Sequence, residues 1–153
     1  MKIQSDLLLP GRIFIMTDET KEASKLFGEG RYCSQAVLGA FCEKYGLDKD
    51  VALRISCGLN SGSRCAEICG AVSGAILVIG MKYGDSSDIC NSKTEEFIEH
   101  FKEKNGEIVC RSIMGCDIFT PEGRAKAMNE DLFGTLCAKA VSNAAETLKE
   151  LGY

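Results

Sequence analysis

Residues 64–74, RCAEICGAVSG, are the most informative stretch of this chain. They place two cysteines four residues apart and two glycines four residues apart, at the start of a long apolar run. Glycine costs a helix about 1 kcal/mol relative to alanine, so a helix keeps it where another group must come close to the backbone. The stretch therefore raises two questions: what approaches this backbone, and why thiols lie beside it.

The spacing predicts one helix over about residues 64–83, ending at Gly84. Its uncharged part, residues 68–81, would be about 21 Å long, shorter than a membrane span, so we expect a buried central helix. Residues four apart share a helix face, which would align Cys65 with Cys69. A neighbouring line of small residues would let another helix or a cofactor press against the backbone: Ala66, Gly70, Ser73 and Gly74. Packing between helices alone is the alternative explanation.

Most other segments also have helical patterns, and strand signals are nearly absent. We expect helices over about 18–27, 33–46, 48–56, 92–105, 107–114 and 132–151, and another starting at Thr120-Pro121. Asp48 is a predicted N-cap, and Ser92 with Glu95 a predicted capping box. The fold class predicted is a single-domain all-α bundle of six or seven helices over residues 16–153. Residues 1–15 are expected to be a mobile N-terminal extension or an over-long gene start.

Composition excludes several classes of function. The chain has 153 residues, a net charge of −4, no tryptophan and no cluster of lysine or arginine. Nucleic acid and anionic membranes are therefore poor candidates for partners. Nine cysteines form an odd set, and no secretory signal is visible, so a disulfide scaffold is disfavoured. We expect a cytoplasmic protein, in which clustered thiols are metal ligands or redox groups.

Four cysteines are expected to point inward from four different helices. Cys33 lies in the first turn of its helix, where the helix dipole favours a thiolate. Cys110 lies on the inner side of a short helix, and Cys137 begins the apolar stripe of the last one. With Cys69 they would form a single site, although any one of them alone would more often be an inert buried residue.

These cysteines carry a resemblance to a known family. CGAVSG at residues 69–74, CSQAV at 33–37, and Cys110 and Cys137 downstream resemble the redox-active family named for its C…GCAxxG…C…C signature. The likeness runs from about Glu19 to the C-terminus and includes ILVIGMKYG after the motif. It implies that Cys33, Cys69, Cys110 and Cys137 are the functional set, redox-active or binding a metal or an iron–sulfur centre. The module is also similar to the iron–sulfur part of a split haem cytochrome.

The sequence departs from that family before the motif. Its connector, CGLNSGSRC at residues 57–65, is poorer in glycine and adds Cys57 and Cys65. Cys65 could be a fifth ligand, a resolving thiol or a replacement for one of the four, and Cys116 could also reach the site. Cys42 is assigned to packing, and Cys90 to an incidental thiol in a polar loop.

Spacing alone does not identify the chemistry. No C-x-x-C pair is present, so neither zinc-knuckle nor ferredoxin spacing applies. The absence of tight pairs favours a cluster or another large site over a knuckle-type zinc ion. Together with the resemblance, it leads us to expect an iron–sulfur cluster that transfers electrons to an unknown partner, with Gly70 and Gly74 giving the cluster room. A zinc-binding module and dithiol–disulfide exchange are the alternatives. The single histidine, His100, lies on a charged helix face and supports no hydrolytic site. Glycine-lined apolar helices often pair, so the sequence also allows a homodimer.

Overall fold

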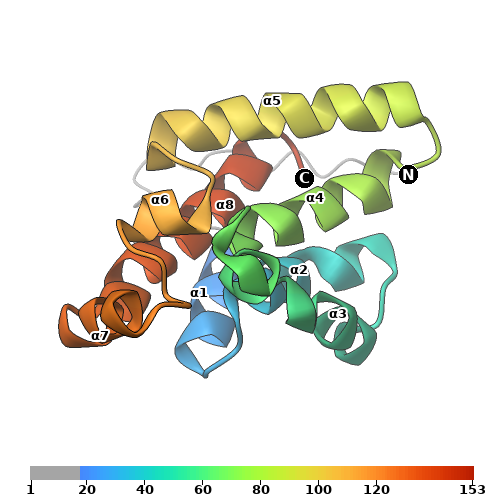
Figure 1. The fold of residues 1–153 in the computed structure, drawn as a ribbon. Helices are drawn as coiled ribbons and strands as arrows, with labels where there is room; N and C mark the ends of the chain where they lie inside the picture. Colours follow the sequence, from blue (N-terminus) through green and yellow to red (C-terminus); the bar gives the residue numbers. More distant parts are fainter. Residues whose placement is uncertain (1–17) are drawn as a thin grey trace, which may run out of the picture.

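The protein is described here by a computed structural model, which covers residues 18–153. Figure 1 shows a bundle of helices, and within these residues the only β pairing is an isolated bridge between Ile68 and Val109. The all-α prediction is confirmed, with eight α-helices in this range in place of the six or seven expected. Their bounds are α1 Asp18–Gly28, α2 Cys33–Phe41, α3 Lys49–Ser56, α4 Gly70–Tyr83, α5 Ser87–Asn105, α6 Cys110–Met114, α7 Pro121–Asn129 and α8 Ala138–Glu150. The prediction for residues 1–15 lies outside the described part.

The core forms where α4 crosses α2. A methyl group added at Gly74 would lie 2.7 Å from the carbonyl oxygen of Ser34, so only glycine allows this approach of the two backbones. Around the crossing, α5 covers one side of α4, and α1 and α8 pack together beside α2 (Figure 1). The buried side chains include Val37, Phe41, Val72, Val78, Ile79, Phe97, Phe101, Val141 and Leu148. Helix packing therefore explains Gly74, the second glycine of the motif.

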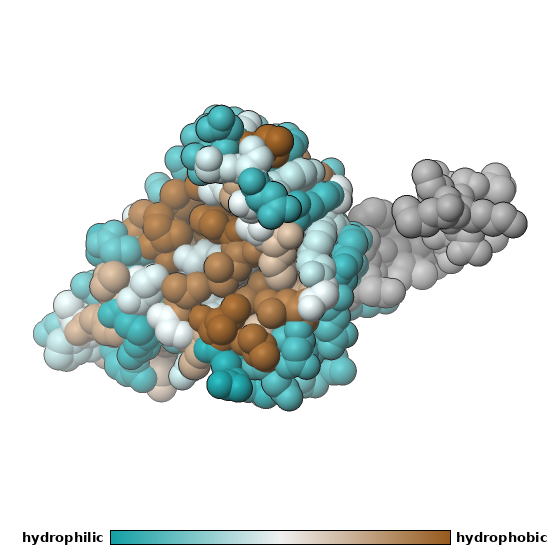
Figure 2. All heavy atoms as spheres, turned by 90° about the vertical axis from the view of Figure 1, so that its right-hand side faces the viewer, coloured by the Kyte–Doolittle hydropathy of each residue, from teal (hydrophilic) through white to brown (hydrophobic). Residues whose placement is uncertain are grey.

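One stripe of α4 is left partly uncovered by the rest of the described chain. Ile76, Leu77 and Met81 are only partly buried, and a methyl group at Gly80 would meet nothing within 4 Å. Figure 2 shows a patch of apolar atoms on the side of the molecule where the C-terminal end of α4 lies. On α3, Val51 and Ile55 are exposed as well. None of the helices within residues 18–153 has the length and hydrophobicity needed to cross a bilayer.

The predicted starts of three helices are wrong. The last helix, α8, begins at Ala138 and not near residue 132, because a π-helical turn, Phe133–Cys137, precedes it. The central helix begins at Gly70 and not near Arg64, because Ser61, Ser63, Arg64 and Ala66 all have positive φ. Left-handed residues cannot continue a right-handed helix, so the chain turns sharply through Gly62–Ala66 before α4 starts. Helix α5 begins at Ser87, capped by Ser86, so Ser92 and Glu95 lie inside the helix and form no capping box at its start. Cys90 consequently lies in α5 and not in a loop.

Other local predictions are confirmed. Oδ1 of Asp48 accepts the N–H of Val51 at 3.1 Å and caps α3. Oγ1 of Thr120 accepts the N–H of Gly123 at 3.0 Å, and Pro121 is the first residue of α7. These caps depend only on neighbouring residues, which is why the sequence reveals them.

Candidate cysteine site

A single cavity of about 310 Å³ lies between the N-terminal ends of α2, α4 and α6 and the π-helical turn Phe133–Cys137 that precedes α8. Cys33, Cys69, Cys110 and Cys137 all line it. Four cysteines that are far apart in the sequence therefore share one space, as their pattern predicts. Cys69 and Cys110 are the most buried of the four, with 7% and 8% of their surface exposed.

Cys33 is the first residue of α2 and packs against the start of α4. A methyl group at Gly70 would lie 2.5 Å from the Cys33 sulfur and 3.0 Å from the carbonyl oxygen of Leu59. Gln35 anchors this end of the helix: its Oε1 accepts the N–H of Tyr32 at 3.0 Å, and its Nε2 donates to the carbonyl of Leu53 at 2.8 Å. The group that approaches the backbone of α4 at Gly70 is therefore the Cys33 thiol, which is why this position is a glycine.

Cys69 and Cys110 are brought together by a short backbone pairing. The N–H of Cys69 donates to the carbonyl of Ile108 at 2.7 Å, and the N–H of Cys110 donates to the carbonyl of Glu67 at 2.6 Å. An ion pair between Arg111 and Glu67 joins the same two segments at the surface. Both cysteines sit at helix starts, Cys69 as the N-cap of α4 and Cys110 as the first residue of α6.

Cys137 closes the cavity from the side of α8. It ends the π-helical turn, and its thiol lies 3.5 Å from the sulfur of Met114 on α6. Apolar side chains from α6, the loop after it and the π-helical turn complete this wall, namely Ile113, Met114, Ile118 and Phe133. The wall therefore keeps most water away from the sulfur atoms.

Burial raises the pKa of all four thiols. Burial is the main cause for Cys69, whose pKa rises to about 12, and for Cys110, whose pKa rises to about 11. Nearby thiolates add to this, because Cys33 disfavours ionisation of Cys69, Cys110 and Cys137. Burial also raises the pKa of Cys33 and Cys137, although backbone N–H groups, including that of Ser61, partly offset it at Cys33. The four thiols thus stay protonated unless a positive charge stabilises them together.

The sulfur atoms line the cavity without meeting at one point. Among residues 18–153, no three cysteine, histidine, aspartate or glutamate side chains are placed to hold one metal ion. All nine cysteines are free thiols. A single tetrahedral ion, with metal–sulfur bonds of about 2.3 Å, would require the side chains to move inward.

Several residues predicted for the site lie outside the cavity. Cys65 is exposed, and its thiol donates to the carbonyl of Gly62 at 3.2 Å, because the left-handed turn before α4 separates it from the Cys69 face. Gly74 serves the crossing of α4 with α2 and does not line the cavity. Cys57 is exposed, and Cys116 lies near Cys110 without lining the cavity.

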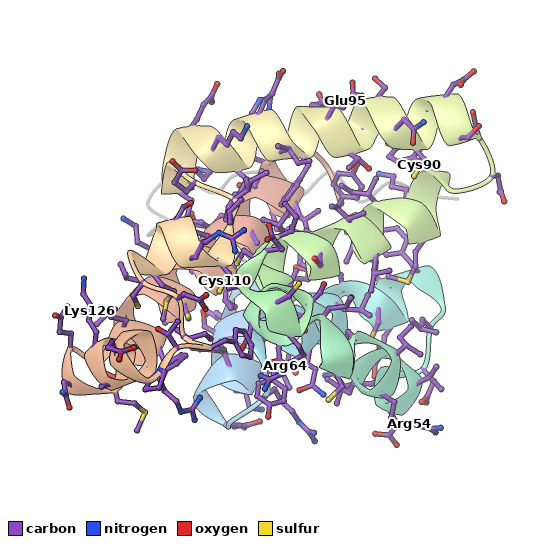
Figure 3. All side chains as sticks on the ribbon, in the orientation of Figure 1. Arg54, Arg64, Cys90, Glu95, Cys110 and Lys126 are labelled. Atoms are coloured by element: carbon purple, nitrogen blue, oxygen red, sulfur yellow. The ribbon has the colours of Figure 1, made fainter. Side chains whose placement is uncertain are left out.

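The two cysteines assigned to other roles also lie apart from it. Cys42 is fully buried in the core, as predicted, with its thiol 3.4 Å from the carbonyl of Gly39. Figure 3 shows Cys90 near the start of α5, to the right of and well apart from Cys110.

The structure also adds polar residues that sequence reasoning missed. Asn60, Ser61, Arg64 and Arg124 line the cavity together with the cysteines. Asn60, Ser61 and Arg64 belong to the connector before α4, and the sequence pattern did not predict the left-handed backbone that brings them to the cavity. Arg124 lies in α7, and no local motif connects it to the cysteines.

The comparisons with known proteins agree with this arrangement. No curated protein and no solved structure matches the chain. A family described as "Putative redox-active protein (C_GCAxxG_C_C)" matches residues 31–151, which include all four cysteines of the cavity. Since the match covers most of the sequence, the chain belongs to this redox-active, cysteine-rich family.

Proposed function

We propose that Cys33, Cys69, Cys110 and Cys137 bind an iron–sulfur centre and that the protein transfers electrons. One observation carries the proposal: four thiols from four separate segments line one cavity. Four cysteine thiolates are the usual ligand set of two- and four-iron clusters. When bound, such a centre supplies reversible one-electron oxidation and reduction.

The residues present fit a centre larger than a single ion. The thiols are spread around about 310 Å³, and no three of them in the described chain are placed for one metal ion. Gly70 leaves the start of α4 without a side chain where Cys33 packs. A cavity of this size has room for a multinuclear cluster, whose usual ligands are four cysteine thiolates.

The raised thiol pKa values support metal binding over dithiol exchange. Exchange requires a thiolate that is accessible at neutral pH. Here burial raises the pKa of Cys69 to about 12 and that of Cys110 to about 11, so neither is a ready nucleophile. A cationic centre removes this penalty because the thiolates then neutralise it.

The surrounding residues would tune the centre and protect it from solvent. Backbone N–H groups of Ser34, Ser61 and Gly70 favour the ionised form of the Cys33 sulfur. Hydrogen bonds to cluster sulfur and the low polarity of the Ile113, Met114 and Phe133 wall are both factors that set the potential of such a centre.

The test is to purify or reconstitute the full-length protein without oxygen and to measure iron, acid-labile sulfide, visible absorption and the electron paramagnetic resonance of the reduced sample. We expect a brown protein, bleached by dithionite, and loss of iron in the serine variant of each cavity cysteine. Cys57→Ser is the matched control, because Cys57 is exposed and does not line the cavity. Colourless protein that binds zinc, or iron binding that survives the four variants, would refute the proposal.

A further inference from the structure

The cysteine cavity has a cationic rim. Among the described residues that line it are two arginines, Arg64 and Arg124, and no aspartate or glutamate. This composition runs against that of the whole chain, which has 22 acidic and 18 basic residues. Both arginines are exposed, whereas Cys69 and Cys110 are buried. The positive charges therefore face the solvent side of the cavity.

Arg64 is held in place without an acidic partner. Its guanidinium carbon lies 4.9 Å from the centre of the Phe119 ring, and its Nη1 donates to Oδ1 of Asn60 at 3.3 Å. Its backbone has a φ of 63°, so the left-handed turn before α4 sets the direction of its side chain. Within residues 18–153 it forms no ion pair, in contrast to Arg111, which pairs with Glu67.

The loop before α7 brings Arg124 to the same rim. Oγ1 of Thr120 donates to the carbonyl of Asp117 at 2.8 Å, and the N–H of Phe119 donates to Oδ1 of Asp117 at 2.9 Å. These bonds shape the loop that places Phe119 under Arg64, and α7 then starts at Pro121 and carries Arg124. In the described part of the chain, Arg124 forms no ion pair with a carboxylate either.

We propose that Arg64 and Arg124 form an oxyanion-binding subsite at the mouth of the cysteine cavity, so that the cavity receives a small molecule bearing a phosphate or carboxylate group. Guanidinium groups bind both of these through paired, charge-assisted hydrogen bonds. Asn60 and Ser61 supply neutral polar groups beside the arginines.

This inference deepens the proposed function, because it names the class of molecule that would meet the centre, but anion binding itself requires only the cavity. It is tested by calorimetric titration of the full-length protein, with and without bound iron, using inorganic phosphate and acetate in Tris chloride. We expect saturable binding of at least one probe. Arg64→Gln and Arg124→Gln should each weaken it about tenfold or more, as expected for losing one charge-assisted contact.

Arg54→Gln is the matched control, since Figure 3 shows Arg54 on α3, away from α7 and the cavity. The inference would be overturned if Arg54→Gln weakened anion binding as much as the cavity variants do. It would also be overturned if the wild type bound neither phosphate nor acetate. Arg64→Gln changes a residue of the left-handed turn and could prevent folding. Arg124 is exposed on α7, so Arg124→Gln should fold and still test the inference.

Iron and sulfide content of the same variants separates the two proposals. Variants that lose phosphate binding and keep iron support the oxyanion subsite. If the arginine variants lose iron and the wild type binds no anion, the arginines only balance the charge of the centre. That result would overturn the oxyanion subsite. Anion binding by a wild-type protein that never takes up iron would refute the proposed function alone.

Discussion

Cys69 and Cys110 are held side by side by their own backbones. Each donates its N–H to a carbonyl on the other's segment, Cys69 to Ile108 and Cys110 to Glu67. Two cysteines that are distant in sequence are thus placed by main-chain hydrogen bonds, which do not depend on whether the thiols are ionised. The cavity is accordingly formed in the folded chain before anything binds.

The exposure of the cysteines predicts their order of alkylation. With iodoacetamide at pH 8, Cys57 and Cys65 should react first in the metal-free protein, because both are exposed. Cys42 and Cys69 should react slowly, since burial raises the pKa of each thiol and also blocks access. Peptide mapping by mass spectrometry at several times would measure this order. Equal rates in the folded protein and in urea would contradict the described burial.

Gly70→Ala should displace the Cys33 thiol. The added methyl group would lie 2.5 Å from that sulfur and 3.0 Å from the Leu59 carbonyl, so one of them must move. We expect reduced iron content after reconstitution, with the helical circular dichroism retained. Gly58→Ala is the control, because nothing lies within 4 Å of the position of its methyl group. Normal iron content in Gly70→Ala would argue against Cys33 as a ligand.

Gly74→Ala and Gly80→Ala should have opposite effects on stability, although both lie in α4. At Gly74 the methyl group would press on the Ser34 carbonyl and separate α4 from α2, which costs about 1–3 kcal/mol as overpacking. At Gly80 it meets open space, so better helix propensity should add about 0.5–1 kcal/mol. Urea unfolding of the two variants measures both. Destabilisation by Gly80→Ala would instead point to a second molecule packed on the open stripe of α4.

Stability of the metal-free protein should fall as the pH rises above about 9. The folded pKa values of Cys69 and Cys110, about 12 and about 11, exceed the ordinary value of 9.0. The unfolded chain therefore binds fewer protons than the folded one in this range, and the free energy of unfolding decreases with pH. The stabilisation is complete below pH 9 and is lost as pH rises towards 12.

Urea unfolding between pH 8 and 10.5 would check this, with a Cys69→Ser, Cys110→Ser double variant as the comparison. Its stability should depend less steeply on pH. Parallel curves for the two proteins would show that these thiols do not cause the decrease.

The helical class, most helix ends and the choice of four cysteines follow from the sequence alone. N-caps such as Asp48 and Thr120, and the apolar spacing within each helix, are properties of neighbouring residues. Local hydrogen bonds and side-chain periodicity act over one or two turns, so a sequence pattern is enough to reveal them. The family signature points to the four cysteines, and the structure shows that these four line one cavity.

The start of α4, the exclusion of Cys65 and the arginine rim were decided only by tertiary structure. The sequence pattern predicts a helix from about residue 64, yet the main-chain pairing of residues 67–69 with 108–110 requires the chain to turn before the helix begins at Gly70. That pairing joins segments about forty residues apart, and the contact of Arg64 with Phe119 joins segments still farther apart. Such long-range contacts override local helix preference because burial and backbone hydrogen bonds outweigh the tenths of a kcal/mol by which propensities differ.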